Sequence, residues 1–355
     1  MRHLINSVLV LSAIVASSAS AADLPAKKTA PAAAASMQGC PAFGAGFFNI
    51  PGGETCLKIG GYFRYMGYVQ TPDTGITNAA YSQAGRYRLE LDARSNSEVG
   101  TVRGFARITD NATDRAFVQL GGLTAGAYSA TTDIAGIVGE TFSALYNDGT
   151  NVTGGIKYDA AFGATTVTLG FENAKDQNAS SSVSDRPDAL IGVKTKLGDL
   201  NASIIGVNHH VQGGTSGEAE GYALLSNVGT SVGALAANMW GGVSKGASRY
   251  TYSTALAVAT WPDSDANAGN LADGANYGGQ IVYTAGQVKV ASQMSQATLS
   301  YNGSKYTSNR YGLAFITTPA PGLTVEPGVT IYQNTDQNAS ATTTTRAYLQ
   351  IKSAF

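Results

Sequence analysis

The segment from Arg86 to Arg94 alternates strictly between charged and apolar positions. Each even-numbered position in RYRLELDAR carries a charge, and each odd-numbered position is apolar or aromatic. In an extended strand these two sets of side chains lie on opposite faces. The charged face is too costly to place in a dry core, because each buried charge loses its hydration. The pattern therefore predicts a strand with one face toward water and the other toward apolar surroundings.

The same period of two recurs along the chain, and helical spacing is nearly absent after residue 40. It is clearest in the segments 57–69, 102–108, 165–171, 189–197 and 346–352. Strands of about ten residues exceed the ~5–6 residues usual in soluble sheets and match the length of a tilted transmembrane strand. Alternation alone also suits a soluble sandwich, so strand length is the first feature that favours a membrane barrel.

The connections between these segments alternate between tight turns and long polar loops. Short turns are expected at 95–98, 198–199 and 319–322, and long loops at 172–185 and 333–342. Outer-membrane barrels show this asymmetry, with short periplasmic turns and longer outer loops. Aromatic side chains near strand ends predict the interface girdles of such a barrel: Tyr65, Tyr87, Phe171, Trp240 and Phe355.

A sheet that crosses a membrane must close on itself, so that every backbone group is hydrogen-bonded. About 300 residues follow Cys56, and at roughly 19 residues for each strand with its loops they supply about 16 strands, an even number as in bacterial barrels. A barrel of this size encloses an aqueous channel. The sequence therefore predicts an all-β fold, a transmembrane antiparallel β-barrel over residues 57–355.

Composition and charge agree with a barrel that has two unlike faces. Among 355 residues, Lys and Arg number 23 and Asp and Glu 24, so the net charge is -1, and only 13% are charged, against ~25% in an average protein. The lack of a basic excess excludes bulk-charge binding of nucleic acid. A hydrophobic share of 43% excludes an acidic disordered chain. No apolar run after the N-terminus reaches the ~20 residues that a spanning helix needs.

The N-terminus has the order of a secretory signal peptide. A basic start (MRH) precedes an apolar stretch over 4–16 and small residues up to Ala21. The apolar stretch is too short for a membrane anchor, and the small residues fit a cleavage site. Cleavage is expected after Ala21, which makes residues 1–21 the signal peptide. Residues 22–39, which begin with an Ala- and Pro-rich run, are expected to form a flexible linker.

Cys40 and Cys56 are the two cysteines of the chain. Export makes a disulfide chemically possible, and the glycines and proline of 41–55 let the chain turn back on itself. A bridge that closes a loop of this size stabilises by about 3 kcal/mol in the chain-entropy model. A metal or redox pair is disfavoured, because the sequence has neither a CxxC spacing nor a nearby histidine. A structural disulfide is therefore expected in residues 40–56, ahead of the barrel.

Four segments of the chain resemble one known family. They are GAGFFNIPGGETCLKIGGYFRY (44–65), YRLELDARSNSEVGTVRGFARI (87–108), RAFVQLGGLTAG (115–126) and the terminal RAYLQIKSAF (346–355). Together they are similar to the alphaproteobacterial general porins, the outer-membrane diffusion porins of that group. The first segment is quite specific, with a glycine and aromatic run, a proline turn, a cysteine and then a strand. Between about 175 and 345 the similarity is one of strand pattern.

The resemblance implies a barrel of about 16 strands in the bacterial outer membrane, assembled as a homotrimer, with loop 3 folded into the lumen. It implies a water-filled channel for passive diffusion of small hydrophilic solutes and ions, in contact with outer-membrane lipid. It implies no catalytic residue, cofactor or metal, so the chain is not expected to be an enzyme. The terminal strand resembles the closing strand recognised during outer-membrane assembly, with Phe355 as its signal.

The chemistry of such a channel lies in a narrow charged waist, where opposed charges select solutes by charge and size. Adjacent strands lie ~4.8 Å apart, so cations on neighbouring inward faces form a basic wall. The arginines predicted to form it are Arg64, Arg86, Arg88, Arg103, Arg107 and Arg346. Glu90 and Asp92 lie on the same face and are expected to offset part of this charge. The alternative is a generic water-filled lumen with scattered charge.

Residues 131–151 form the candidate loop 3. A long, partly apolar loop needs a surface to cover, and Ile134 and Ile137 supply apolar contacts. This favours a loop folded into the lumen over an exposed extracellular loop. Its acidic residues are expected to face the basic wall: Asp133, Glu140 and Asp148.

Other function classes remain open. In a plugged structural or adhesive barrel the inward arginines would form satisfied ion pairs, and conductance would rise when 131–151 is deleted. A substrate-specific channel is a milder variant, although the sequence shows no aromatic slide for sugars. A barrel enzyme, such as a protease or lipase, would need His209 near Asp185 or Asp188 at the rim. Loss of turnover on replacing His209 with alanine would support it.

Overall fold

The computed structural model describes residues 38–72, 80–134, 136–139, 151–173, 186–212, 218–251, 270–336 and 341–355. All of them belong to the second of the chain's two units, Met37–Phe355. The expected signal peptide and residues 22–37 of the expected linker lie outside the described residues, as do Glu140 and Asp148 of the candidate loop. Among the described residues, no helix is both long enough and apolar enough to cross a membrane.

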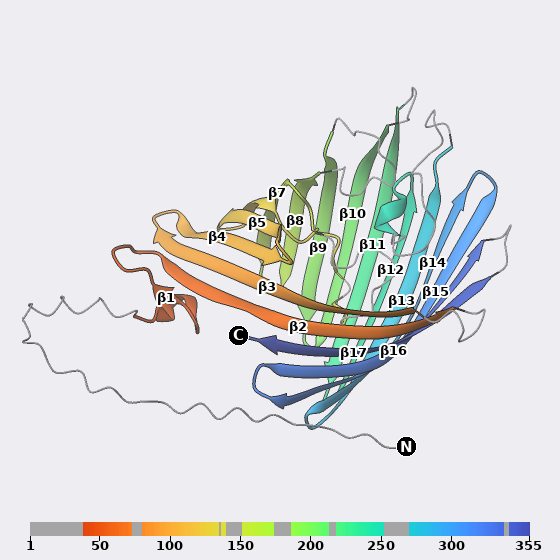
Figure 1. The fold of residues 1–355 in the computed structure, drawn as a ribbon. Coiled ribbons are helices and arrows are strands. Elements are labelled where there is room, and N and C mark those ends of the chain that lie inside the picture. Colours follow the sequence, from red (N-terminus) through yellow and green to blue (C-terminus); the bar gives the residue numbers. More distant parts are fainter. Residues whose placement is uncertain are drawn as a thin grey trace, which may run out of the picture. The chain divides into compact units, whose positions relative to one another are not determined.

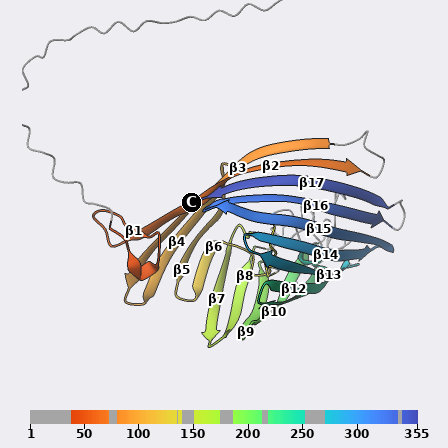
Figure 2. The ribbon, with the colours of Figure 1, turned by 90° about the horizontal axis from the view of Figure 1, so that it is seen from below.

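Within these ranges, sixteen strands, β2 to β17, form one closed antiparallel barrel (Figures 1 and 2). Each strand pairs with the next, and β17 pairs with β2, which confirms the predicted closure. The strands are β2 (Cys56–Pro72), β3 (Ala80–Ser97), β4 (Gly100–Thr109), β5 (Ala112–Leu120), β6 (Leu123–Ala127), β7 (Gly155–Phe162), β8 (Thr165–Glu172), β9 (Asp188–Leu197), β10 (Leu200–Gln212), β11 (Glu218–Val232), β12 (Leu235–Lys245), β13 (Asp273–Ala285), β14 (Val288–Tyr301), β15 (Ser304–Ala320), β16 (Leu323–Asp336) and β17 (Thr342–Ala354).

The two ends of the barrel differ in their connections. At one end, which we call the short-turn end, each odd-numbered strand from β3 to β15 is joined to the next strand by a tight turn. In the predicted turn 198–199, Gly198 adopts φ +60°, a left-handed conformation that glycine tolerates best. The predicted turns at 95–98 and 319–322 start too early, because strand pairing continues to Ser97 and Ala320.

The alternating pattern places large apolar side chains on the outside of the barrel. Phe63 on β2 is 63% exposed, and Leu169 on β8 and Ile281 on β13 are also exposed. Residues that stand opposite each other in paired strands share a face, so the alternate, polar positions point inward. The charged face of β3 is one of these inner faces, as its alternation predicts.

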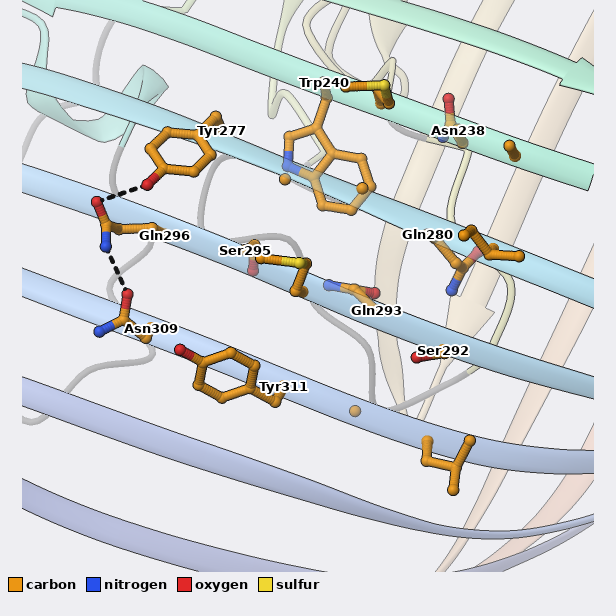
Figure 3. Close-up of a pocket in the computed structure, with 18 of the residues that line it drawn as sticks. Asn238, Trp240, Tyr277, Gln280, Ser292, Gln293, Ser295, Gln296, Asn309 and Tyr311 are labelled. Carbon is orange, nitrogen blue, oxygen red and sulfur yellow. Dashed lines mark hydrogen bonds between the residues drawn. The ribbon is translucent and has the colours of Figure 1, made fainter.

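The expectation that Trp240 belongs to an outer aromatic girdle is wrong. Trp240 is 4% exposed and shares the inner face with Gly278 of β13, with which it pairs. A Cβ at Gly278 would clash with the indole, so the glycine leaves room for the ring to lie across the neighbouring strand. Both residues line a pocket of about 880 Å³ in this part of the wall (Figure 3). Tyr65, Tyr87, Phe171 and Phe355 are exposed.

Apolar side chains also line part of the inner wall, on β9, β10 and β11. Leu190, Ile205 and Leu225 are buried there, packed with Tyr250 of the short 3-10 helix η4 (Ser248–Tyr250). The η4 helix therefore lies against the inner wall and removes these apolar side chains from water.

The predicted disulfide between Cys40 and Cys56 is confirmed. It closes a segment, residues 38–55, that we call the disulfide segment. This segment contains the 3-10 helix η1 (Pro41–Phe43) and the short strand β1 (Phe48–Asn49). Its small core consists of the bridge and Phe47, with Phe43 packed against them.

The disulfide segment covers part of one edge of β2. Pairing of β17 with β2 ends at Ala354 and Tyr62, followed by one backbone pair between Phe355 and Gly61, so the first residues of β2 extend beyond the terminal residue. There β1 takes the place of β17 and pairs with Cys56 and Leu57. Backbone groups of β2 that would otherwise form an open sheet edge are partly satisfied in this way.

Replacing both cysteines with serine is expected to loosen the disulfide segment and leave the barrel folded. The bridge contributes about 3 kcal/mol in the chain-entropy model. Exchange of the Asn49 and Ile50 amide hydrogens, which bond to Gln38 and Thr55 within the segment, is therefore expected to accelerate roughly a hundredfold. Hydrogen–deuterium exchange measures this, and reduced wild-type protein is the matched control. Unchanged exchange in both samples would contradict the prediction.

Candidate pore constriction

The arginines predicted for the basic wall lie on β2, β3, β4 and β17, on the face opposite the exposed apolar side chains. The register shows this directly, since Lys352 of β17, Arg64 of β2 and Arg86 of β3 stand opposite one another. The partners of these arginines are mainly aromatic rings in one group and carboxylates in another, and Arg88 of the first group also has an ion pair, with Glu90 at 3.9 Å.

The first group surrounds the ring of Tyr62. The guanidinium carbons of Arg88 and Arg64 lie 4.8 and 5.6 Å from the ring centroid, and the Lys352 ammonium nitrogen lies 5.8 Å from it. A cation at this distance is attracted by the negative face of the ring. Arg88 also donates to the Thr109 hydroxyl at 3.4 Å. Three cations from three strands thus share one aromatic support.

A similar arrangement surrounds Arg346 on β17. Its guanidinium lies 4.5 Å from the Tyr68 centroid and 5.2 Å from that of Tyr332, and it donates twice to the Gln70 amide oxygen, at 3.2 and 2.7 Å. Arg310 of β15 lies 5.1 Å from the same Tyr332 ring. We call the members of both groups the tyrosine-backed cations: Arg64, Arg88, Arg310, Arg346 and Lys352.

The remaining predicted arginines are paired with carboxylates. Arg103 donates to both oxygens of Asp92 at 3.0 and 2.9 Å. The guanidinium of Arg107 lies 2.6 Å from Asp114, and that of Arg86 lies 3.0 Å from Asp110 in the turn after β4. These acids offset the arginine charges locally. The carboxylates that offset this part of the wall are thus Asp92, Asp110 and Asp114.

Sequence reasoning missed several members of this region. Arg310 and Lys352 share the inner face with the predicted arginines, and the period-two pattern already assigns Lys352 to the same face as Arg346. Arg115 of β5 was also missed; it pairs with Arg107 and donates to Asn151 at 2.8 Å. These residues could have been found by following the alternation of inward and outward positions along every strand, as far as β15 and β17.

The candidate loop is anchored at its start to a buried acid. The backbone N–H and the hydroxyl of Thr131 donate to one carboxylate oxygen of Glu172 at 2.8 and 2.7 Å. Glu172, at the end of β8, is fully buried. The preceding Tyr128 is buried as well, and burial, with the nearby charge of Glu172, raises the pKa of its hydroxyl. The Tyr128 hydroxyl therefore stays protonated and uncharged beside this anchor.

The loop then runs along the inner wall to β13. The Val138 amide donates to the Gln280 side-chain oxygen at 2.8 Å, and the Gln280 side-chain nitrogen donates to the Val138 carbonyl at 2.7 Å. Ile134 packs against the apolar cluster of β9–β11, and Ile137 against a second cluster that includes Val282. Residues 131–134 and 136–139 thus lie inside the barrel.

The second cluster extends along the inner wall toward the tyrosine-backed cations. Its buried residues are Val282, Ala291, Ala314 and Tyr348, and Ile137 and Tyr68, which supports Arg346, each pack against this cluster. Asp133 is half-buried near the start of the loop. Asp133 therefore lies in the interior, and the other two predicted loop acids, Glu140 and Asp148, lie outside the described residues.

His209 does meet an acid, but in a closed site. Its Nδ1 lies 2.8 Å from one oxygen of Asp188, and the Tyr250 hydroxyl donates to the other oxygen at 2.5 Å. All three side chains are 0% exposed. A substrate has no access to this pair, and its hydrogen bonds join η4 to β9 and β10. The arrangement favours a structural role. Asp185 lies outside the described residues.

The terminal residue closes the barrel at its seam. Phe355 and Gly61 exchange backbone hydrogen bonds at 3.1 and 3.2 Å, and the Phe355 ring stacks on Phe63 with centroids 5.7 Å apart. The ring is 60% exposed on the outer surface. This position leaves Phe355 accessible at the end of the last strand.

Comparison with known proteins identifies relatives of this chain. A sequence model described as "Porin subfamily" matches residues 26–354. The putative outer membrane protein y4fJ of Sinorhizobium fredii is 33% identical over 161 residues, which cover 37% of this chain and 46% of that protein. Porin Omp2b of Brucella canis is 33% identical over 148 residues, 34% of this chain and 40% of Omp2b. Each match thus spans less than half the length of the relative.

Solved structures share the fold at low sequence identity. The outer membrane channel DcaP of Acinetobacter baumannii superposes with a TM-score of 0.74 at 13% identity, covering 85% of this chain and 97% of DcaP. The anion-selective porin from Comamonas acidovorans gives a TM-score of 0.59 at 12% identity, covering 85% and 100%. The fold is that of outer-membrane barrels. Since the family match extends over nearly the whole sequence, the chain belongs to the porin subfamily and resides in the outer membrane.

Proposed function

We propose that this chain forms a water-filled channel through which small hydrophilic solutes and ions diffuse passively. The observation that supports it most is the closed barrel of sixteen described strands, with polar and charged side chains inside and large apolar ones outside. A barrel of this strand number leaves an aqueous interior. Family and fold point to a channel rather than an enzyme.

The constriction lies between the loop and the tyrosine-backed cations. The loop is fixed to the wall at Glu172 and again at Gln280, so it narrows the interior from the side of β8–β13. Arg346 and the other tyrosine-backed cations face the loop from the opposing strands β15, β17, β2 and β3. Asp133, with Glu140 and Asp148 of the same loop, supplies the acidic side. The resulting transverse field selects solutes by charge and size.

The tyrosines hold the cations in place, and an aromatic face stabilises a cation without adding a negative charge of its own. A carboxylate within hydrogen-bond distance, as on Arg107, offsets much of the field of an arginine. We assign the tyrosine-backed cations to the basic side of the constriction, with Arg88 partly offset by Glu90 at 3.9 Å, and expect Arg86, Arg103 and Arg107, each within 3.0 Å of a carboxylate, to contribute less. This assignment narrows the predicted basic wall to Arg64, Arg88 and Arg346 and adds Arg310 and Lys352.

The proposal extends to processing and assembly. Residues 1–21 are removed as a signal peptide, and the mature chains form a homotrimer through part of the apolar outer surface. Phe355 is the signal by which the last strand is recognised during insertion. Its exposed ring at the end of β17 supports this role.

Planar bilayers test the channel directly. Folded protein is expected to insert with discrete conductance steps, and heat-denatured protein in the same detergent is the control. Deletion of 132–150 is expected to enlarge each step, because the loop occupies part of the lumen. Folded protein that conducts only after this deletion would show a plugged barrel, and folded protein that never conducts would refute the channel.

A further inference from the structure

A second charged site lies at the short-turn end, away from the constriction. A cavity of about 540 Å³ is bounded on one side by the disulfide segment and on the other by the inner face of β3–β5. Its lining includes Ala42, Phe43, Arg94, Asn96, Arg103 and Gln119. Arg94 pairs with Cys56 of β2, and Arg88 pairs with Tyr62, six residues further along β2. At ~3.3 Å per residue, Arg94 is therefore roughly 20 Å from the cations around Tyr62.

Two arginines in this cavity share one carboxylate. Arg94 donates from Nε and Nη2 to the two oxygens of Asp92 at 3.0 and 2.8 Å, and Arg103 does the same at 3.0 and 2.9 Å. Two guanidiniums against one carboxylate leave one net positive charge. Lys58, which stands opposite Asp92 on β2, adds a second. The described lining residues of the cavity include no further acid.

Both guanidiniums are fixed in orientation. Arg94 lies 4.7 Å from the Phe47 centroid, and Arg103 lies 5.1 Å from Phe105 and 5.3 Å from Phe117. Asp92 accepts from the Nε–Nη2 edge of each arginine, which leaves the Nη1 group of Arg94 and one Nη1 hydrogen of Arg103 as further donors on two side chains that line the cavity. The Nη1 of Arg103 donates a long hydrogen bond, 3.4 Å, to the Gln119 side-chain oxygen. Fixed, planar donors of this kind suit a two-oxygen acceptor.

We propose that this cavity binds a small oxyanion, a carboxylate or phosphate group, through Arg94 and Arg103. The amides of Asn96 and Gln119 supply further donors for its remaining oxygens. The site faces the short-turn end, so its occupancy does not depend on conduction through the constriction. Its anion approaches from the side of the membrane where the short turns lie.

The disulfide makes the site complete. Ala42 and Phe43 belong to η1, and Phe47, which supports Arg94, lies in the same closed loop. The segment is attached to the barrel through the bridge to Cys56 and the pairing of β1. Opening the bridge therefore frees one wall of the cavity and the aromatic support of Arg94. Reduction is expected to weaken anion binding.

Calorimetric titration of the folded protein in uncharged detergent tests the proposal, with inorganic phosphate and acetate as separate probes. Wild-type protein is expected to bind at least one of them saturably, and the two titrations show which oxyanion is preferred. Arg94→Gln is expected to weaken binding by roughly tenfold, because it removes a charge-assisted donor pair. It leaves Arg103 on Asp92, so that carboxylate keeps a partner.

Arg86→Gln is the matched control, since Arg86 is also an inner-face arginine of β3 with a carboxylate partner but lies away from the cavity. It is expected to bind as wild type does. Equal loss in both variants would mean that the lumen attracts anions without a site, and unchanged binding by Arg94→Gln would also overturn the proposal. Arg94→Lys, which keeps the charge but not the planar fork, and reduced wild-type protein are both expected to bind more weakly; full affinity in both would contradict the geometry.

Discussion

Replacing Arg64, Arg88 and Arg346 together with glutamine is expected to shift the channel toward cations. Each of these charges interacts with an ion ~4 Å away by about 1 kcal/mol in water, so their loss is expected to raise the cation-to-anion permeability ratio by roughly tenfold or more at low salt. The reversal potential across a KCl gradient measures this ratio. The shift is expected to shrink as the ionic strength rises, since salt screens these charges.

Arg86→Gln is the control for this experiment as well. Arg86 lies on the same inner face, but its guanidinium is half-exposed and paired with Asp110 at 3.0 Å. Its loss is expected to change the reversal potential much less than the loss of any one tyrosine-backed cation. An unchanged potential in the triple variant would show that these residues do not face the permeant ions. A shift as large in Arg86→Gln would show that the tyrosines do not distinguish the two groups.

Detaching the loop is expected to produce the second large effect. Gln280→Ala removes both hydrogen bonds to Val138, and Glu172→Ala removes the two bonds from Thr131. Each such hydrogen bond contributes about 1 kcal/mol. The double variant is therefore expected to give larger and noisier single-channel currents than wild type, and each single variant a smaller effect in the same direction.

A matched glutamine on the other face separates the loop from general destabilisation. Gln296 of β14 bonds to Tyr277 at 3.0 Å and to Asn309 at 2.7 Å (Figure 3), and none of these residues touches the loop in the contacts described. Gln296→Ala is expected to leave current amplitude and noise unchanged. Wild-type currents in the double variant would contradict a loop that narrows the lumen, and increased noise in Gln296→Ala would attribute the effect to the wall.

Most of the fold follows from the period of two. Charge at every second residue of β3 decides which face meets water, and this local rule needs no knowledge of the neighbouring strands. Trp240 was assigned to an outer girdle from its expected position near a strand end, without use of the alternation of faces. The alternation along β12 places its side chain on the inner face, against Gly278. The residues exposed on the outer face at this level are instead Met239 and Tyr277.

The candidate site follows from the sequence only in part, because its charges depend on register. Asp92 joins Arg94 and Arg103 because Arg94 stands opposite Arg103 across β3 and β4, and no local pattern predicts that pairing. The anchor of the loop is still harder to foresee. Val138 and Gln280 are 142 positions apart, so their contact exists only once the barrel is closed. The role of the tyrosines as supports for cations has the same origin.

The pairing of β17 with β2 has a consequence for the order of assembly. Arg346 and Gln70 are separated by 276 positions, so the seam is the last contact that a chain made from its N-terminus can form, and contacts between such distant residues form slowly. The disulfide, by contrast, joins residues only 16 apart. The first residues of β2, which β17 does not reach, therefore acquire their neighbour β1 early, and in a chain that lacks the bridge this part of the β2 edge is expected to stay open to pairing with other chains.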